Sequence, residues 1–363
     1  MNILVLASEE YLTLRLLKCL AAQKHTVAIL GAGPGAVLKA SRHCRTYQAF
    51  DPHGLANFSG PLGAEIERNC SRFAIDVILP SGMACGFFLA ATRTSLPVPT
   101  LPLPPLELLR VMDNKWKFSR LLQQHGLPFP KSRLLECSAD GDALDLEFPV
   151  ILKPLDLDAS RGVTRCETPA EVSAHLRAVG TKLPLLAQEY IPGADVGLGL
   201  LAQAGTVLAS TVQRQCADGS GVEFIRDEAI QEIGRRIIAV CGYDGIAHFD
   251  LRIDSRDGSV KVLECNPRFW ASLPFCMLAG VNFADLGIRL ALKQPVPVTA
   301  CRPVRIAFPT RALSETVRGR LGAESRKALS YTLSDPVPNL LLGAGKAGRK
   351  LHATFFKTPK EVH

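Results

Sequence analysis

The first hundred residues alternate between short apolar runs and segments in which apolar positions recur at helical spacing. The apolar runs cover residues 2–7, 26–30 and 76–80, and the helical spacing covers 9–23 and 82–91. Strands that alternate with helices in this way predict a parallel sheet with helices packed on its faces. The first part of the chain is therefore expected to have an α/β fold.

Two segments interrupt this pattern. Residues 31–35 (GAGPG) follow the second apolar run, but they lack the G-x-G-x-x-G order of a dinucleotide-binding loop, so we interpret them as a turn. Residues 96–105 (LPVPTLPLPP) contain five prolines, which neither continue a helix nor donate to a central ladder. This stretch predicts a connector and a domain boundary.

The strongest alternation lies in residues 247–254 (AHFDLRID), within a region of mixed strands and helices that extends to about residue 290. The apolar side chains of 247–254 share one face and the polar side chains share the other. The turn at 255–259 (SRDGS) predicts a hairpin with 260–266. Pairing Asp254 with Val260 then puts Asp250 directly opposite Glu264.

Residues 262–270 (VLECNPRFW) carry polar side chains at every second position, namely Glu264 and Asn266 on the return strand and Arg268 just past it. Two facing carboxylates at ~5 Å repel unless a cation lies between them or one of them is protonated. With Asn266 they form a set of hard oxygen ligands suited to Mg²⁺, or alternatively to Mn²⁺. An exposed hairpin face with a solvated Arg252–Asp254 pair is the other interpretation.

Two further segments contain candidate binding groups. Lys153 ends the apolar strand FPVILKP (148–154), and the loop at 158–163 offers backbone N–H groups and a guanidinium to phosphates. A strand edge with a polar loop fits this segment equally well. QEYIPGAD (188–195) would present backbone groups to a base and an acid to ribose hydroxyls, or it would form a plain turn.

Composition is typical of a globular enzyme of two or three domains, with 363 residues of which 47% are hydrophobic and 21% charged. No apolar run approaches the ~20 residues of a membrane span. The start, MNILVLASEE, lacks the basic region of a secretory signal, which indicates a cytoplasmic protein. The 11 cysteines include no CxxC pair and are expected to be reduced.

The net charge of +8 is located at the C-terminal end. Residues from Arg302 onward contain 12 Lys/Arg and 4 Asp/Glu, which accounts for the whole excess. A nucleic-acid-binding protein would more often present basic and aromatic side chains on a folded face, and only 6% of this chain is aromatic. We therefore expect no nucleic-acid partner.

Taken in order, Lys115, FPVILKP, SRGV, QEYIPGADV, AHFDLRID and LECNPRFW resemble the ATP-grasp superfamily of carboxylate–amine ligases, in particular the branch that includes the carbamoyl-phosphate synthase large subunit. The resemblance spans roughly residues 100–290. It implies a Rossmann-like pre-ATP-grasp domain over 1–105. An ATP-grasp domain of two α+β subdomains that clasp ATP would follow over 106–300, with its lid at about 130–190, and a basic extension over 301–363.

The resemblance also implies roles for individual residues. The residues implied to bind ATP are Lys115, Lys153, Ser160, Arg161, Gly162, Val163, Glu189, Tyr190, Ile191 and Asp195. Within this set, Lys153 reaches the phosphates, 160–163 close over them, 189–191 hold adenine by side-chain and backbone hydrogen bonds, and Asp195 binds the ribose. Asp250, Glu264 and Asn266 would hold magnesium, and Arg268, with Lys153, would assist phosphoryl transfer.

The implied activity is ATP-dependent amide formation between a small carboxylate and an amine through an acyl phosphate, with release of ADP and phosphate. The alternatives are a carboxylase or carbamoyl-type enzyme, a nucleotide-binding protein without turnover, and a nicotinamide oxidoreductase. Homodimers are common among similar enzymes. Asp195 stands where such enzymes usually have the longer Glu. His248, Arg252 and Arg214 receive no assignment.

Overall fold

The computed structural model describes residues 1–363 except 59, 142–143, 158–160, 181–182 and 344–363. The described residues form two compact units. The first comprises 1–100, 271–278 and the described residues from 306 onward, and the second comprises 101–270 and 279–305. The expected combination of a parallel α/β sheet with antiparallel α+β sheets is confirmed. The domain boundaries at 105 and 300 stay a prediction.

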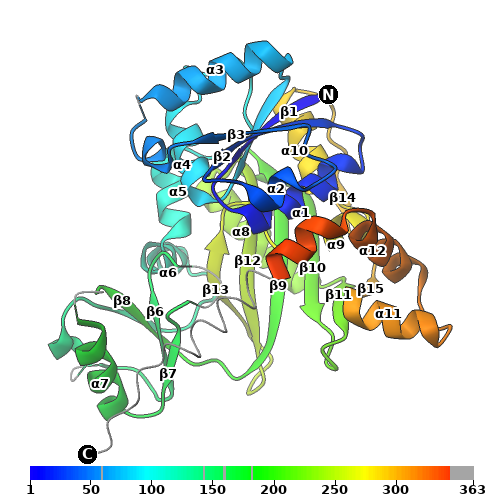
Figure 1. The fold of residues 1–363 in the computed structure, drawn as a ribbon. Coiled ribbons are helices and arrows are strands. Elements are labelled where there is room, and N and C mark those ends of the chain that lie inside the picture. The colour runs from blue at the N-terminus through cyan, green and yellow to red at the C-terminus, as the bar shows by residue number, and fades with distance from the viewer. Residues whose placement is uncertain (59, 142–143, 158–160, 181–182, 344–363) are drawn as a thin grey trace, which may run out of the picture. The chain divides into compact units, whose positions relative to one another are not determined.

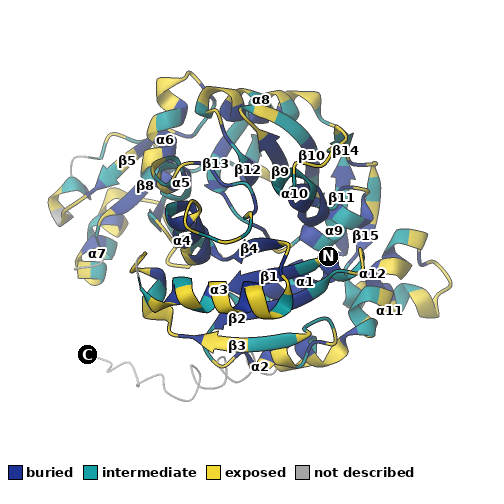
Figure 2. Cartoon of the chain, turned by 90° about the horizontal axis from the view of Figure 1, so that it is seen from above, coloured by how far each residue is buried: buried dark blue, intermediate teal, exposed yellow. Residues whose placement is uncertain are grey.

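The first unit contains a parallel sheet in the order β3-β2-β1-β4. Figure 1 labels β1, β2 and β3, and Figure 2 labels all four strands. Its strands are β1 (Asn2–Ala7), β2 (Thr26–Ala32), β3 (Thr46–Phe50) and β4 (Val77–Ser81). Its helices are α1 (Glu10–Ala21), α2 (Ala36–Lys39), the 3-10 helix η1 (Pro52–Leu55), α3 (Pro61–Phe73), α4 (Met83–Thr92), α9 (Leu273–Leu278), α11 (Pro309–Val317) and α12 (Ala323–Ser334). Strand β1 is buried along almost its whole length, as Figure 2 shows. The order of strands and helices along residues 1–92 confirms the predicted alternation.

The glycine-rich segment 31–35 ends β2 and leads into α2. The hydroxyl of Tyr47 donates to the carbonyl of Gly33 at 2.7 Å. A Cβ on Gly31 or Gly35 would lie only 2.4 or 2.1 Å from atoms of the Tyr47 side chain. These glycines therefore make room for a tyrosine, which agrees with their interpretation as a turn.

Buried hydrogen bonds hold the end of α12 to the segment that follows α2. Ser41 Oγ donates to Asp335 Oδ2 at 2.5 Å, and the backbone N–H of Arg42 donates to Asp335 Oδ1 at 3.1 Å. Asp335 is only 3% exposed. A buried carboxylate is tolerated when its oxygens accept hydrogen bonds, and these two donors meet that need.

The second unit begins with two helices and a small antiparallel sheet in the order β5-β8-β6-β7. Its elements are α5 (Leu106–Asp113), α6 (Lys115–Gln124), β5 (Ser132–Leu135), the 3-10 helix η2 (Ser138–Gly141), β6 (Val150–Pro154), β7 (Thr164–Cys166), α7 (Pro169–Val179) and β8 (Leu185–Glu189). Asn114 caps α6 by accepting from the N–H of Lys117 at 3.0 Å. Leu152 joins the core between this sheet and α7, so strand alternation directs Lys153 to the opposite face.

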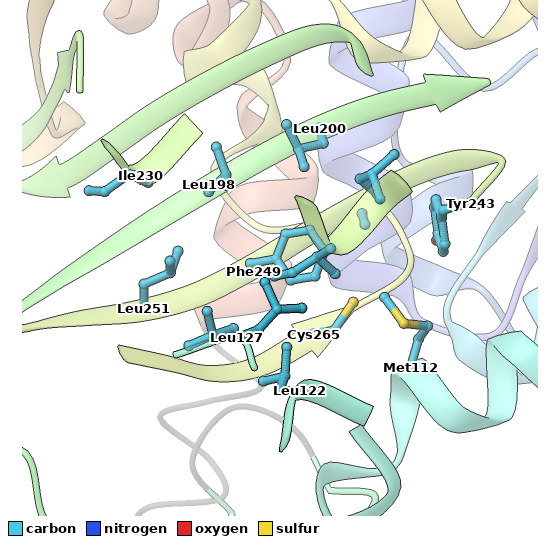
Figure 3. Close-up of a cluster of buried hydrophobic side chains, with 14 of the residues drawn as sticks. Met112, Leu122, Leu127, Leu198, Leu200, Ile230, Tyr243, Phe249, Leu251 and Cys265 are labelled. Carbon is cyan, nitrogen blue, oxygen red and sulfur yellow. The ribbon is translucent and has the colours of Figure 1, made fainter. Parts of the chain in front are cut away.

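The larger sheet of the second unit has the order β13-β12-β9-β10-β11-β15, with β14 beside β10. Its elements are β9 (Gly193–Gln203), β10 (Thr206–Gln215), β11 (Gly221–Ile225), α8 (Glu228–Cys241), β12 (Gly245–Asp254), β13 (Val260–Asn266), α10 (Phe283–Ala291), β14 (Thr299–Ala300) and β15 (Val304–Ala307). Apolar side chains from β9, β12 and β13 pack against α5, α6 and α8 on one face, among them Leu198, Leu200, Phe249 and Cys265 (Figure 3). The other face carries the polar side chains of β12 and β13 beside buried apolar ones such as Leu201 and Ile246.

Two general expectations from composition can be compared with the structure. All of the cysteines are free, which confirms that they form no disulfide framework. Within the part of the chain that the structure describes, no helix is both long and apolar enough to cross a membrane.

Replacing Asp335 tests the attachment of α12. Asp335→Ala should lower the free energy of unfolding by about 2 kcal/mol, because it leaves the buried hydroxyl of Ser41 and the part-buried N–H of Arg42 without their acceptor. Urea denaturation monitored by circular dichroism measures this change. Glu107→Ala, which removes a 79% exposed member of a surface ion pair, should change stability by less than about 0.5 kcal/mol. Equal effects of the two substitutions would contradict the inference.

Lys18 should give stability a specific pH dependence. Burial, and secondarily Arg15, lowers the pKa of Lys18 to about 8. The unfolded chain therefore binds more protons between pH 8 and about 10.4, and the contribution of Lys18 to stability rises with pH in that window. Lys18→Met should be more stable than the wild type at pH 7, and the difference should shrink by about 1–3 kcal/mol by pH 10. A difference independent of pH in paired urea titrations would refute this.

Candidate functional site

The β12–β13 hairpin brings two acidic side chains together. Asp250 pairs directly with Glu264, which confirms the predicted register at this point. The predicted pairing of Asp254 with Val260 is wrong, however, because Val260 pairs with Ile253. A β-bulge shifts the register between Asp250 and Leu251, and this extra residue restores the facing carboxylates.

Asn266 completes the set from the same strand. Its side-chain amide donates to Asp250 Oδ2 at 2.9 Å, and this orientation leaves the amide oxygen available to a ligand. Asp250, Glu264 and Asn266 all lie on the face of the sheet away from the apolar core. The structure therefore brings the three predicted metal ligands together.

The two carboxylates affect each other strongly. Burial of the carboxyl group, and then the nearby Glu264, raise the pKa of Asp250. Burial would also raise the pKa of Glu264, but Lys115 and Lys153 outweigh it and hold this pKa below its ordinary value. The two pKa shifts are opposite in direction, so within this pair Asp250 binds a proton more readily than Glu264 does.

Two lysines from different elements converge on the acidic pair. Lys115 Nζ, at the start of α6, lies 3.3 Å from Glu264 Oε2 and donates to the carbonyl of Leu157 at 2.6 Å. Lys153, near the end of β6, is 6% exposed. Its burial lowers its pKa to about 8, while Glu264 and Asp250 act in the opposite direction. The site thus combines two carboxylates and two buried cations.

Aromatic rings lie beside this group on the same face of the sheet. The ring of Trp270 lies 5.0 Å from that of His248 and 5.0 Å from that of Phe283. A Cβ on Gly197 would be 2.7 Å from His248, and one on Gly199 would be 2.5 Å from Trp270. These two glycines of β9 therefore allow the rings to pack directly on the sheet.

His248 connects the acidic pair to β10. Its Nδ1 lies 3.5 Å from Asp250 Oδ1, and its Nε2 lies 3.5 Å from Gln213 Nε2. Burial and the charge of Arg268 lower the pKa of His248 to about 4, so the imidazole is neutral near pH 7. The same Arg268 charge acts on Asp250, which places this arginine close to both residues.

The segment between β8 and β9 is held by an arginine that the sequence pattern did not indicate. Arg256 Nη2 lies 3.0 Å from Glu189 Oε1, and its guanidinium forms several hydrogen bonds with Asp254. Arg256 lies in the turn at 255–259, where an exposed charge is the ordinary interpretation. The carboxylate of Glu189, predicted to contact adenine, is thus engaged by the guanidinium group of Arg256. Asp254 also pairs with Arg256, rather than with Arg252.

Tyr190 makes contacts with two guanidinium groups. The Arg165 group is 4.2 Å from its ring centroid and the Arg252 group is 5.4 Å away. Cation–π contacts of this kind stabilise the position of an aromatic ring. Ile191 follows as a buried residue, and Asp195 has a 78% exposed side chain on β9. The predicted nucleotide segment therefore joins the two sheets at a well-packed junction.

The predicted phosphate loop lies between β6 and β7. Ser160 is outside the described residues. Arg161, Gly162 and Val163 occupy the exposed turn that leads into β7, and Gly162 has a φ of +73°. Their approach to phosphate groups stays a prediction.

Sequence models of two ATP-grasp families match the segments that form this site. The family described as ATP-grasp in the biosynthetic pathway with Ter operon matches residues 181–312, and the RimK-like ATP-grasp domain matches residues 112–220. Together the two matches cover residues 112–312, so this part of the chain is similar to ATP-grasp domains. The two matches overlap over the junction between the sheets and together include β12, β13 and both lysines.

Individual ATP-grasp relatives are distant. D-aspartate ligase of Enterococcus faecium is 26% identical over 210 residues, which cover 49% of this chain and 49% of that protein. The carbamoyl phosphate synthase large chain of Thermoanaerobacter sp. is 24% identical over 205 residues, or 51% of this chain and 19% of that protein. The chain thus aligns with about half, or less, of these relatives' own length.

A solved ATP-grasp structure shows the same fold over most of the chain. The L-amino acid ligase from Bacillus licheniformis superposes with a TM-score of 0.61 at 20% identity, covering 80% of this chain and 74% of that chain. At this level of identity the likeness concerns the fold alone.

Gly193 offers a test of how β9 meets β12. Its φ is +137°, and a Cβ there would lie 1.9 Å from the backbone oxygen of Ile253. Gly193→Ala should therefore destabilise the protein by at least about 2 kcal/mol, as measured by urea denaturation. Gly258→Ala is the matched control, because Gly258 has a φ of +75° but open space around it. Its cost should be near 1 kcal/mol, and equal costs would show that the close approach at Gly193 is unimportant.

Proposed function

We propose that this chain is an ATP-dependent carboxylate–amine ligase. The γ-phosphoryl group of ATP is transferred to a small carboxylate, and an amine then attacks the acyl phosphate to form an amide. ADP and phosphate are released. The observation that carries the proposal is the group formed by Asp250, Glu264 and Asn266 beside the buried Lys115 and Lys153.

The three oxygen-bearing side chains fit a divalent cation such as Mg²⁺ or Mn²⁺. Burial, and then the charge of the facing Glu264, raise the pKa of Asp250, and a bound cation would offset both by favouring the ionised carboxylate. The free amide oxygen of Asn266 supplies a third hard ligand, and Mg²⁺ in such sites keeps open positions for phosphate oxygens. When bound, the cation would neutralise and orient the triphosphate.

The cationic side chains have distinct tasks in this proposal. Lys153 approaches the phosphates from β6, and Lys115 holds Glu264 in place as a ligand. Arg268 follows β13 immediately after the metal ligands and offsets negative charge as the phosphoryl group moves between two oxygens. Arg161, Gly162 and Val163 close over the phosphates and limit the entry of water, which would otherwise hydrolyse the acyl phosphate.

Adenosine would lie at the junction between the two sheets. The backbone of Glu189, Tyr190 and Ile191 presents hydrogen-bonding groups to the adenine edge. The Glu189 carboxylate is held by Arg256, so we assign adenine recognition to the backbone of this segment. Asp195, whose side chain is exposed on β9, accepts hydrogen bonds from the ribose.

The names of the similar proteins suggest amino acids as substrates. D-aspartate ligase and L-amino acid ligase both act on amino acids by name, and each resembles this chain in sequence or fold. The proposed carboxylate and amine are therefore amino acids or short peptides. No protein nucleophile is needed, because the acyl phosphate is itself reactive toward an amine.

The test is an ADP-release assay with purified protein, MgATP and pairs of amino acids, followed by mass spectrometry of the products. An ATP-dependent condensation product would support the proposal. ADP release that requires bicarbonate alone would favour a carboxylase or carbamoyl-type enzyme. Nucleotide binding without ADP release across the panel would indicate a binding protein.

Removing one carboxylate tests the metal assignment. Glu264→Ala should lower kcat at least about 100-fold, because it removes both a metal ligand and the partner of Lys115. The protein should remain folded by circular dichroism. Glu223→Ala removes an acid of similar kind from an exposed pair with Arg214 and should leave kcat within about twofold. Near-normal turnover by Glu264→Ala would rule out the metal site.

A further inference from the structure

Arg252 lies directly across from Asp195 in the β12–β9 ladder. Its Nε is 3.5 Å from Asp195 Oδ1, and the two side chains are 25% and 78% exposed. The arginine is therefore largely covered, whereas the acid faces outward. Of the two, only Asp195 is free to meet a ligand.

Two other contacts fix the guanidinium group of Arg252. Its Nη2 donates to the carbonyl of Gly193 at 3.1 Å, and the group lies against the ring of Tyr190 at 5.4 Å. Gly193 is itself held close to Ile253, where a side chain would collide with the backbone. The group that faces Asp195 is thus anchored to a rigid part of the sheet.

The contact between Arg252 and Asp195 is incomplete in this structure. Arg252 Nε is buried and has no hydrogen-bond partner among the described residues. At 3.5 Å from Asp195, it needs only a small movement of the carboxylate to form a charge-assisted hydrogen bond. A buried unpaired donor is costly, so any ligand that draws Asp195 into line with Nε is favoured.

We propose that Arg252 is a positioning residue that orients Asp195 toward the ribose, so that the site distinguishes a ribonucleotide from a 2′-deoxyribonucleotide. This inference rests on the proposed function, in which Asp195 receives the sugar. Arg252 donates to one carboxylate oxygen and leaves the other for the sugar hydroxyls. Its charge also reduces repulsion between Asp195 and the nearby phosphates.

Calorimetric binding of ADP and 2′-deoxyADP, each with MgCl₂, tests this role without knowledge of the other substrates. Wild type should bind ADP about tenfold more tightly than 2′-deoxyADP, the effect of one charge-assisted hydrogen bond. Arg252→Met should reduce this ratio to about twofold while changing the affinity for 2′-deoxyADP little. In an Asp195→Ala background, Arg252→Met should have no further effect on the ratio.

Two more variants separate positioning from folding. Arg214→Met makes the same chemical change in an exposed cross-strand pair with Glu223 and should leave the ratio unchanged. Arg252→Lys keeps the positive charge, and it provides a folded variant if Arg252→Met does not fold. It should give an intermediate ratio, because an ammonium cannot contact Gly193 and Asp195 with the geometry of a guanidinium.

The outcomes distinguish this inference from the proposed function. A ratio that stays near the wild-type value in a folded Arg252 variant overturns the role of Arg252, as does a wild type that binds both nucleotides equally. Both results leave an ATP-dependent enzyme intact. A wild type that binds neither nucleotide overturns the proposed function and this inference together.

Discussion

The repulsion between Asp250 and Glu264 is the constraint on which the site depends. Two carboxylates in directly facing positions of an antiparallel pair would destabilise an ordinary hairpin. Here a bulge on the strand pair places them together, and Lys115 and Lys153 compensate part of their charge from two other elements. Such an arrangement has the charge distribution that the proposed divalent cation would stabilise.

Strand β12 connects this centre to both the core and the nucleotide segment. Its apolar side chains, such as Phe249, are buried against the helices, so the strand has little freedom to move. Its opposite face presents His248, Asp250 and Arg252 in sequence, with Asp254 at the end. Asp250 and Arg252, which pairs with Asp195 of β9, are therefore positioned by the same strand.

The arginines around the junction give a second level of organisation. Arg256 connects Glu189 to the end of β12, and Arg165 and Arg252 both contact the Tyr190 ring. Guanidinium groups suit this task because they stack on rings and form several hydrogen bonds in one plane. Three arginines from other elements thereby stabilise the position of Glu189 and Tyr190.

The sequence alone determined the strand–helix alternation of the first unit and the two faces of β12, because both depend on local periodicity. Tertiary structure decided the rest. It placed the bulge that brings Asp250 opposite Glu264. It also paired Glu189 with Arg256 and Asp335 with Ser41, and such side-chain contacts leave no periodic signal in the sequence. Periodicity records which face of an element is buried, whereas the partner of a charged side chain depends on how distant elements pack.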